Sequence, residues 1–552
     1  MTRSMRRALR DRRAVLRGDP ADSDSGIALI MVLLILMAVS GILVGLLSMS
    51  LGGMAQARAR QDSPASLQAA QAGIDDFLIR LNQSPTNYVP DPTTNPALTG
   101  WVPVSGATNG AKYRYWVDNA VQATSGRVTV ISSGMVNKKV RTVRASLKIN
   151  SFADYLYFTN YEVRDPALPG GSSSCAVYGW QTARSAGCNI YFRGAGGVTD
   201  QLDGKVFSND IIATAGSPVF GDTVETGAPS GSVPPAYNRD TSTAGFPVFN
   251  NAAGGTTNAP YQALPAGNSQ LQTDATTSFG GKTGCVYYGS TKIRFVPAVP
   301  GTPGHMMVTS PNTTAAESPA GRGCGTWPVS LPGSQAEQWV PLPGNGIVYV
   351  ADMPSGTGTC LTEFQSTRST TPIWLPGDID TYACRNGDAW VHGTNSGQVT
   401  VGAQNDIYLT NNLLNTGGTS ITGLIANNFI WLWHPVNSGG ANNLQETTVE
   451  DGVSVISPPS SIEVDALMLS DTDSIVAQNY DKGPQLGTFK VVGGLIQNFR
   501  GTVGTSGSAT TGYTKLYTYD DRLRGLIPPH FSQPGTITWG RDTTAEESPR
   551  TG

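Results

Sequence analysis

Three pairs of aspartates have the close spacing that a pair of acid/base groups needs. They are Asp378 with Asp380, Asp471 with Asp473, and Asp520 with Asp521. Enzymes that hydrolyse glycosidic bonds use two carboxyl groups, one as the acid and the other as nucleophile or base. None of the three pairs has the His-Gly and Arg-x-Lys neighbours that solenoid-type hydrolases show. We therefore interpret all three as solvated residues of turns.

Other catalytic patterns are missing from the sequence. There is no GxSxG for a serine nucleophile and no GxxxxGK[ST] for a nucleotide phosphate. The four histidines are scattered and no CxxC occurs, so we expect no zinc site; they are His305, His392, His434 and His530. The sequence therefore predicts a protein that is not an enzyme and has neither cofactor nor metal.

The chain contains six cysteines, which is an even number. Outside the cytoplasm, such a set is typical of disulfides, each worth about 3 kcal/mol in the chain-entropy model. Pairing in sequence order would close loops in Gly-rich segments, although six cysteines allow about fifteen pairings. The candidate pairs are Cys175 with Cys188, Cys285 with Cys324, and Cys360 with Cys384.

A long apolar segment near the start must organise these residues in space. Between Asp24 and Arg58 there is no ionisable side chain. As one helix, residues 26–54 would be roughly 40 Å long, more than the ~30 Å hydrocarbon core of a bilayer. We therefore expect a basic leader at residues 1–26 and a transmembrane helix at residues 27–54.

The leader also predicts the orientation of the chain. It holds seven arginines and four aspartates, a charge of 7 − 4 = +3. Positive charge stays on the cytoplasmic side of a membrane. We expect a single-pass membrane protein with a cytoplasmic N-terminus and an extracytoplasmic bulk, on the cell surface or in a pilus.

A basic leader, a glycine and a long apolar helix together resemble the class III signal of type IV pilin-like proteins. The run GIALIMVLLILMAVSG, followed by LQAAQAGIDDFLIRL at residues 67–81, is similar to the N-terminal region of PilX-like minor pilins. The resemblance implies cleavage by a prepilin peptidase between Gly26 and Ile27. It also implies a helix held in the cytoplasmic membrane that packs against other pilin-like subunits.

One position departs from that family. Most pilins carry Glu at the fifth residue of the mature helix, where this chain has Met31. A carboxylate inside a membrane costs about 2.5–3.5 kcal/mol and is normally kept for a partner. Its absence favours a tip, initiator or accessory subunit over a bulk subunit. A plain signal anchor that is never cleaved is the alternative.

The sequence pattern of residues 55–150 predicts a small α+β domain, which we call the head. After an interruption at Pro64, residues 66–82 place apolar side chains three and four apart, as in an amphipathic helix. Residues 112–119, 126–133 and 138–148 then read as strands of an antiparallel meander. A long helix packed on such a meander resembles a pilin head.

Residues 151–535 predict a second, larger domain that is rich in β-structure. Short apolar pieces recur every 8–12 residues, roughly as in a β-sandwich or a β-solenoid. Asn-rich corners favour the solenoid. We expect residues 536–552 to form a disordered tail. Residues 204–210, 426–435, 483–500, 512–524 and 528–531 resemble an uncharacterised exported domain found behind PilX-like N-termini, which implies no activity.

Two aromatic groups lie in this domain. Phe429, Trp431 and Trp433 alternate with Ile430 and Leu432, and we expect them in the core because both faces of the strand are apolar. A second group should cap the last coil and cover its edge, with a partner-docking surface as the alternative; it comprises Tyr513, Tyr517, Tyr519 and Phe531.

The whole chain is therefore expected to be mainly β, with one N-terminal transmembrane helix, a small head and a solenoid. Its net charge of −3 and pI of about 5.9 give no footprint for nucleic acid. The predicted function is a minor pilin or pilus assembly protein that displays its β domain for filament priming, adhesion or surface contact. A surface-anchored β-helix enzyme acting on polysaccharide is the alternative.

Overall fold

The chain divides into two compact units, and each is described here by itself. One unit combines Met1–Ile149 with Trp539–Gly552, and the other spans Asn150–Thr538. The computed structural model describes residues 25–83, 91–118, 127–149, 151–182, 184–195, 198–229, 237–250, 254–278, 281–315, 323–328, 336–355, 384–436, 446–450, 453–505, 510–534 and 539–550.

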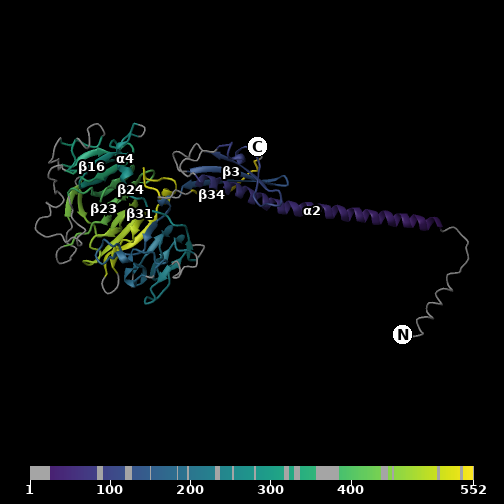
Figure 1. The fold of residues 1–552 in the computed structure, drawn as a ribbon, viewed down its shortest axis with the longest axis horizontal. Helices are drawn as coiled ribbons and strands as arrows, with labels where there is room; N and C mark the ends of the chain where they lie inside the picture. Colours follow the sequence, from purple (N-terminus) through teal and green to yellow (C-terminus); the bar gives the residue numbers. More distant parts are fainter. Residues whose placement is uncertain are drawn as a thin grey trace. The chain divides into compact units, whose positions relative to one another are not determined.

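The first unit is built on one continuous helix, α2 (Ser25–Gln83), which is drawn in purple in Figure 1. The expected interruption at Pro64 is wrong, because the helix runs through this residue. A proline inside a helix removes one backbone hydrogen bond and typically costs about 3 kcal/mol. Pro64 lies on the exposed side of the helix, and the turns that follow it are held by packing on a sheet.

The sheet of the first unit is antiparallel, in the order β1-β2-β3-β4-β34. Alternating apolar residues in the sequence predict its three central strands, and this prediction is confirmed within one to three residues at each end. The strands are β1 (Val102–Pro103), β2 (Lys112–Asp118), β3 (Arg127–Val136), β4 (Lys139–Ile149) and β34 (Trp539–Glu547).

The expected apolar stripe of the helix forms the core of this unit. Ala70, Ile74, Phe77 and Leu81 are all buried against the strands. Close approach is possible because Gly134 on β3 has no side chain: a Cβ there would lie 2.1 Å from the carbonyl oxygen of Ser66.

The last strand corrects the expectation of a disordered tail. Residues 539–547 form β34, which pairs antiparallel with β4 from Trp539 opposite Ile149 onward. Trp539 is buried, and Arg141 and Arg144 on β4 form ion pairs with Glu546 and Glu547. The second unit is therefore inserted between two strands that are neighbours in the sheet of the first.

The second unit is almost entirely β. Its first half contains β5 (Tyr157–Tyr161), β6 (Phe192–Ala195), β7 (Val198–Thr199), β8 (Gln201–Asp203), β9 (Val206–Ser208), β10 (Ile212–Gly216), β11 (Val219–Phe220), β12 (Val224–Thr226), β13 (Tyr237–Arg239), β14 (Val248–Phe249) and β15 (Thr256–Asn258). The helix α4 (Ser269–Thr276) follows.

The second half starts with β16 (Cys285–Tyr288), β17 (Thr291–Val296), β18 (His305–Thr309), β19 (Gln338–Pro341), β20 (Ile347–Ala351), β21 (Ala389–Asn395), β22 (Gln398–Ala403), β23 (Ile407–Asn415), β24 (Ile421–Ala426) and β25 (Ile430–Leu432). It ends with β26 (Glu446–Glu450), β27 (Val453–Ser457), β28 (Ile462–Val464), β29 (Leu467–Ser470), β30 (Ile475–Ala477), β31 (Gln485–Phe499), β32 (Gly504–Thr505) and β33 (Thr511–Tyr519).

Strands of this unit pair mostly in parallel with strands two or more places away in the chain. Within the described residues, the largest sheet has 23 strands. One continuous parallel row through it runs in the order β16, β20, β22, β24, β29, β31, β5, β9, β12, β15. In Figure 1, the yellow-green β31 accordingly lies between green strands and blue strands.

This strand order means that the unit starts and ends in the middle of its own sheet. β5 follows the entry of the chain and pairs with β31, close to the exit. To reach β16 from β15, the chain must pass the whole row, and residues 259–278, which include α4, are a described part of this passage. On the way, Gln262 bonds Asn209, and Asn268 donates to the carbonyl oxygens of Ala403 (2.7 Å) and Ile425 (3.1 Å).

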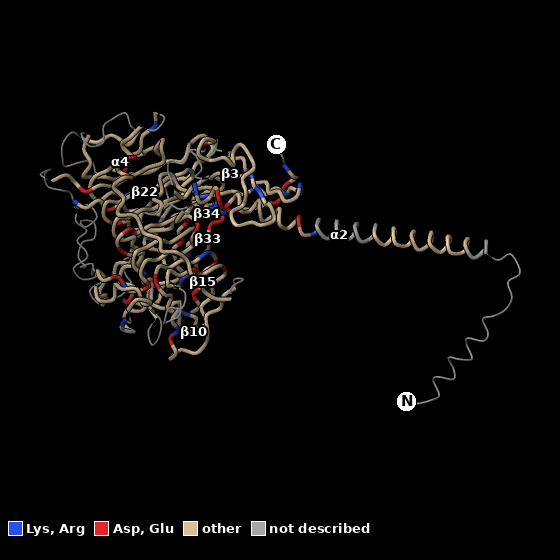
Figure 2. The backbone as a smooth tube through the Cα atoms, turned by 45° about the vertical axis from the view of Figure 1, so that its right-hand side comes forward, with Lys and Arg blue, Asp and Glu red and all other residues tan. Residues whose placement is uncertain are grey.

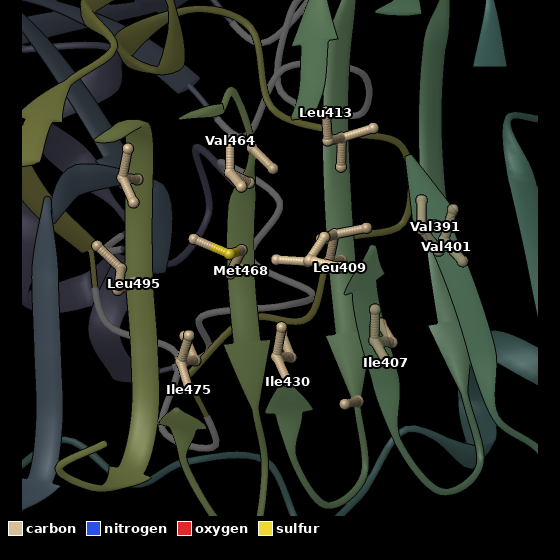
Figure 3. Close-up of a cluster of buried hydrophobic side chains, with 14 of the residues drawn as sticks. Val391, Val401, Ile407, Leu409, Leu413, Ile430, Val464, Met468, Ile475 and Leu495 are labelled. Carbon is tan, nitrogen blue, oxygen red and sulfur yellow. The ribbon is translucent and has the colours of Figure 1, made fainter. Parts of the chain in front are cut away.

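Apolar side chains from successive strands fill the interior. Figure 3 shows them pointing into one cluster, and each is at most 2% exposed. The labelled members are Val391, Val401, Ile407, Leu409, Leu413, Ile430, Val464, Met468, Ile475 and Leu495.

A ladder of amide side chains connects one row of corners. Its donors reach acceptors in neighbouring strand layers at 2.6–3.1 Å, so these mostly half-buried polar groups satisfy one another, with Thr472 accepting through its backbone carbonyl and donating through its hydroxyl. In order, the ladder contains Asn209, Asn160, Asn498, Thr472, Asn428, Asn405 and Asp388.

The expected fold class is confirmed as mainly β with one N-terminal apolar helix, while the solenoid itself stays a prediction. The expectation that Tyr513, Tyr517 and Tyr519 cap a terminal edge is wrong. They lie on β33, which is paired with β31 on one side and with β8 on the other, so β33 is not an edge.

We expect Gly134→Ala to loosen the first unit. The added methyl would overlap backbone atoms of α2, and overpacking of this kind typically costs about 1–3 kcal/mol. Hydrogen exchange of the β3 amides should accelerate in the full-length protein in detergent. Gly100→Ala is the matched control, because the nearest atom to its Cβ is 3.9 Å away. Equal protection of β3 in both variants would contradict the close packing.

We expect Asn160→Ala to destabilise the second unit by about 2–4 kcal/mol. The change removes an acceptor for Asn209 and Tyr178 and a donor to Asn498, three bonds of 2.8–3.0 Å at the contact between β5 and β31. Urea unfolding followed by tryptophan fluorescence measures the loss. The exposed Asn250→Ala serves as the control, and an equally small effect of both changes would argue against the ladder.

Candidate functional site

The first half of α2 exposes apolar side chains on every face. Leu29–Leu47 is long and apolar enough to cross a membrane, a test that a signal sequence near an N-terminus also passes. The least exposed large apolar side chain in it, Val39, is still 46% exposed. Figure 2 shows no charged residue along this part of the helix. A helix that is apolar all round needs an apolar environment from outside the chain.

Two glycines in this segment are four residues apart, at Gly41 and Gly45. A Cβ added at either position would meet nothing within 4 Å. Packing inside the described part of the chain therefore gives no reason for glycine here. Small residues at this spacing let two membrane helices approach closely.

The residues expected at the processing site lie at the start of this helix. Gly26 and Ile27 belong to its first turn, because α2 begins at Ser25. Met31 lies one turn further on, and its side chain is 59% exposed. Residues 1–24 of the leader lie outside the described residues.

Two disulfides match the sequential pairing. Cys175 bonds Cys188 with a Cα–Cα distance of 5.5 Å, and Cys285 bonds Cys324 at the same distance. Cys384 is also disulfide-bonded, and its expected partner Cys360 lies outside the described residues.

The structure describes two of the three candidate acid/base pairs. Asp520 caps a short 3-10 helix, residues Asp521–Arg524, and forms an ion pair with Arg522 at 2.6 Å. Asp521 is exposed and pairs with Arg524 at 3.1 Å. Asp471 is buried, so it is not the solvated residue that we expected. Asp378 and Asp380 lie outside the described residues.

The aromatic run on β25 lies in the core, as predicted. Phe429, Trp431 and Trp433 are each at most 5% exposed. The indole nitrogen of Trp431 donates to Asp406 at 3.0 Å. This cluster is therefore not a surface platform for ligands.

The burial of several carboxyl groups was not indicated by the sequence. Burial raises the pKa of Asp165 to about 7, with a further rise from the charge of Asp473. Burial also raises the pKa of Asp406 to about 6 and that of Asp471 to about 8. No motif surrounds these residues, and only the stacking of distant strands removes them from water.

Nor did the sequence indicate a group of cations around a cavity, because their contact depends on the packing of distant segments. Arg164, Arg193 and Lys515 come from three separate segments and meet only in the folded chain. Among the residues that the structure describes, no three His, Cys, Asp or Glu side chains gather as a metal site would need.

We expect Asp471→Asn to stabilise the protein increasingly as the pH rises from about 4 to about 8. Burial raises the pKa of Asp471 from its ordinary value of 3.8 to about 8, so between these pH values the folded state holds a proton that the unfolded state has lost. The aspartate therefore lowers stability progressively as pH rises through this window. Thermal unfolding should show the variant more stable by at least about 1 kcal/mol at pH 8.5 and unchanged at pH 4. The exposed Asp521→Asn should show no such pH dependence.

No family model matches this sequence, and no curated protein matches it. Among solved structures, the chain is similar to the competence-associated pilin ComZ from Thermus thermophilus. The two share 12% sequence identity with a TM-score of 0.25, and the match covers 88% of this chain and 98% of ComZ.

Proposed function

We propose that the chain is a membrane-anchored pilin-like subunit, either a minor pilin or a pilus assembly or tip protein. One observation carries this proposal: the exposed apolar half of α2 continues without a break into the half that is buried in the head. A cleaved signal peptide would not need to be continuous with a packed element. A stalk that connects a membrane or a filament rigidly to a folded head does need this continuity.

In this proposal, a prepilin peptidase cleaves between Gly26 and Ile27, and the helix then packs against other pilin-like subunits. The exposed glycines at 41 and 45 support close helix contacts. Met31 supports a special position in the filament, because no carboxylate is available there for a neighbour's amino group. Disulfides persist in oxidising compartments, which supports an extracytoplasmic location for the second unit.

We also propose that the second unit is a β-solenoid that the filament displays for priming, adhesion or surface contact. The long parallel row supports this architecture, and so does the ladder of asparagines, since stacked coils repeat one corner residue in register. A solenoid offers long lateral faces for contact without exposing the edges of many strands.

Mass spectrometry of the membrane-embedded protein tests the anchor. We expect a mature N-terminus at Ile27, N-methylated, in cells that possess the peptidase. Gly26→Val should retain residues 1–26 and abolish recovery of the chain with sheared filaments. Gly41→Val is the matched control for processing, because a Cβ there meets nothing within 4 Å among the residues that the structure describes. An intact leader on the wild-type protein would refute the proposal.

A further inference from the structure

The second unit contains a cavity of about 260 Å³ beside the β32–β33 hairpin. It forms where this hairpin meets the residues that precede and begin β6. Three cations line it, Arg164, Arg193 and Lys515, and the only carboxylate among its lining residues is Asp200. The formal charge of the wall is thus 3 − 1 = +2.

Asp200 neutralises only part of this charge. One of its oxygens accepts from the ammonium of Lys515 at 3.3 Å and from the backbone N–H of Arg193 at 2.9 Å. The two guanidinium groups are not paired with it. Arg164 donates one bond to the carbonyl oxygen of Gly170, at 3.3 Å, and its Nε is buried without an acceptor. Arg193 is half-buried; hydrogen bonds, and to a smaller extent the positive charge of Arg193, lower the pKa of Asp240, which does not line the cavity.

A second, smaller cavity shares Lys515 with the first, and both of its cations are paired with carboxylates: Lys515 with Asp200 and Arg500 with Glu162. Arg500 lines it and is 2% exposed. Its Nη1 donates to Glu162 (2.9 Å) and to the carbonyl oxygen of Ile190 (3.0 Å), whereas its Nη2 is buried without a partner. Buried donors that lack acceptors are costly, so a ligand acceptor that reaches the Nε of Arg164 in the first cavity would remove such a cost.

The remaining walls suit a ring that carries hydroxyl groups. Tyr480 and Tyr513 contribute aromatic surface. The hydroxyl of Thr502 is buried without a hydrogen-bond partner, and Thr514 adds another hydroxyl to the wall. The volume lies slightly below the roughly 300–1,000 Å³ of sites for drug-sized ligands, so it corresponds to a single ring.

We propose that this cavity binds an acidic monosaccharide unit, with its carboxylate between Arg193 and Lys515 and its ring against Tyr480 and Tyr513. The hydroxyl of Thr502 bonds a ring hydroxyl. A monatomic or tetrahedral anion would satisfy the guanidinium groups but leave the aromatic and hydroxyl walls without contacts. The inference is independent of the pilin-like function, because it concerns the second unit only and does not require cleavage at Gly26.

Calorimetric titration of the full-length protein in detergent micelles tests this assignment. The probes are glucuronate, galacturonate and N-acetylneuraminate, with glucose, acetate and inorganic phosphate as references. We expect at least one acidic sugar to bind with a Kd of about 1 mM or tighter, and each reference to bind at least about tenfold more weakly. No binding of any acidic sugar at about 10 mM would overturn the proposal, as would equal binding of glucose or phosphate.

Two variants locate the binding. Arg193→Gln should weaken the acidic sugar at least about tenfold, because it removes one charge-assisted bond. Thr502→Val keeps the shape of the side chain and should weaken the sugar without changing the binding of acetate. Arg524→Gln is the control, since this arginine is 64% exposed and does not line the cavity. Unchanged affinity in Arg193→Gln and Thr502→Val would overturn the proposal, and each variant is checked for folding by its thermal transition.

Discussion

The parallel pairing of β31 with strands from both halves of the second unit is the constraint on which this unit depends. Its first part pairs with β28 and β33, and its last part pairs with β29 and β5. The change from one set of partners to the other occurs at Gly493, where φ is 152° and a Cβ would lie 2.0 Å from the carbonyl oxygen of Ala466. Only glycine fits here, because such a φ is strained for other residues. Tyr157 pairs with Leu495, although the two residues are distant in the sequence. Contacts between such distant residues form slowly during folding.

Polar groups reinforce the same contact. Glu162 follows β5, Arg500 follows β31, and their side chains form a buried ion pair at 2.9 Å. Burying two charges costs desolvation that their attraction repays only with good geometry. Asn160 and Asn498 form a second polar contact between these strands, at 2.9 Å. We interpret both contacts as fixing the register in which the two halves meet, because an apolar interface alone would tolerate sliding.

The sequence was most informative where periodicity alone determines structure. The apolar stripe of Ala70, Ile74 and Phe77 and the alternation in KVRTVRASL predicted the helix and strands of the first unit. β34 was missed because it has one buried residue, Trp539, and is held by backbone bonds and ion pairs to β4. No local pattern reveals an edge strand of this kind.

The sites of the second unit could not be read from local patterns. Arg164, Arg193 and Lys515 have ordinary neighbours in the sequence, and they come together only in the folded chain. Asp471 looked like a turn residue, and the stacking of strands around it causes its burial. The disulfides were easier to infer, since both described pairs join cysteines that are adjacent in the cysteine order.

The insertion point of the second unit has a consequence for the architecture of related chains. Ile149 and Trp539 lie directly opposite each other on antiparallel strands, in the position that a short hairpin turn would occupy. The pairing of these strands in the sheet of the head therefore does not depend on the structure of the chain between these two residues. Exchange of the entire inserted unit for another fold, or for a two-residue turn, is compatible with an unaltered stalk and head, which makes the displayed part a replaceable module.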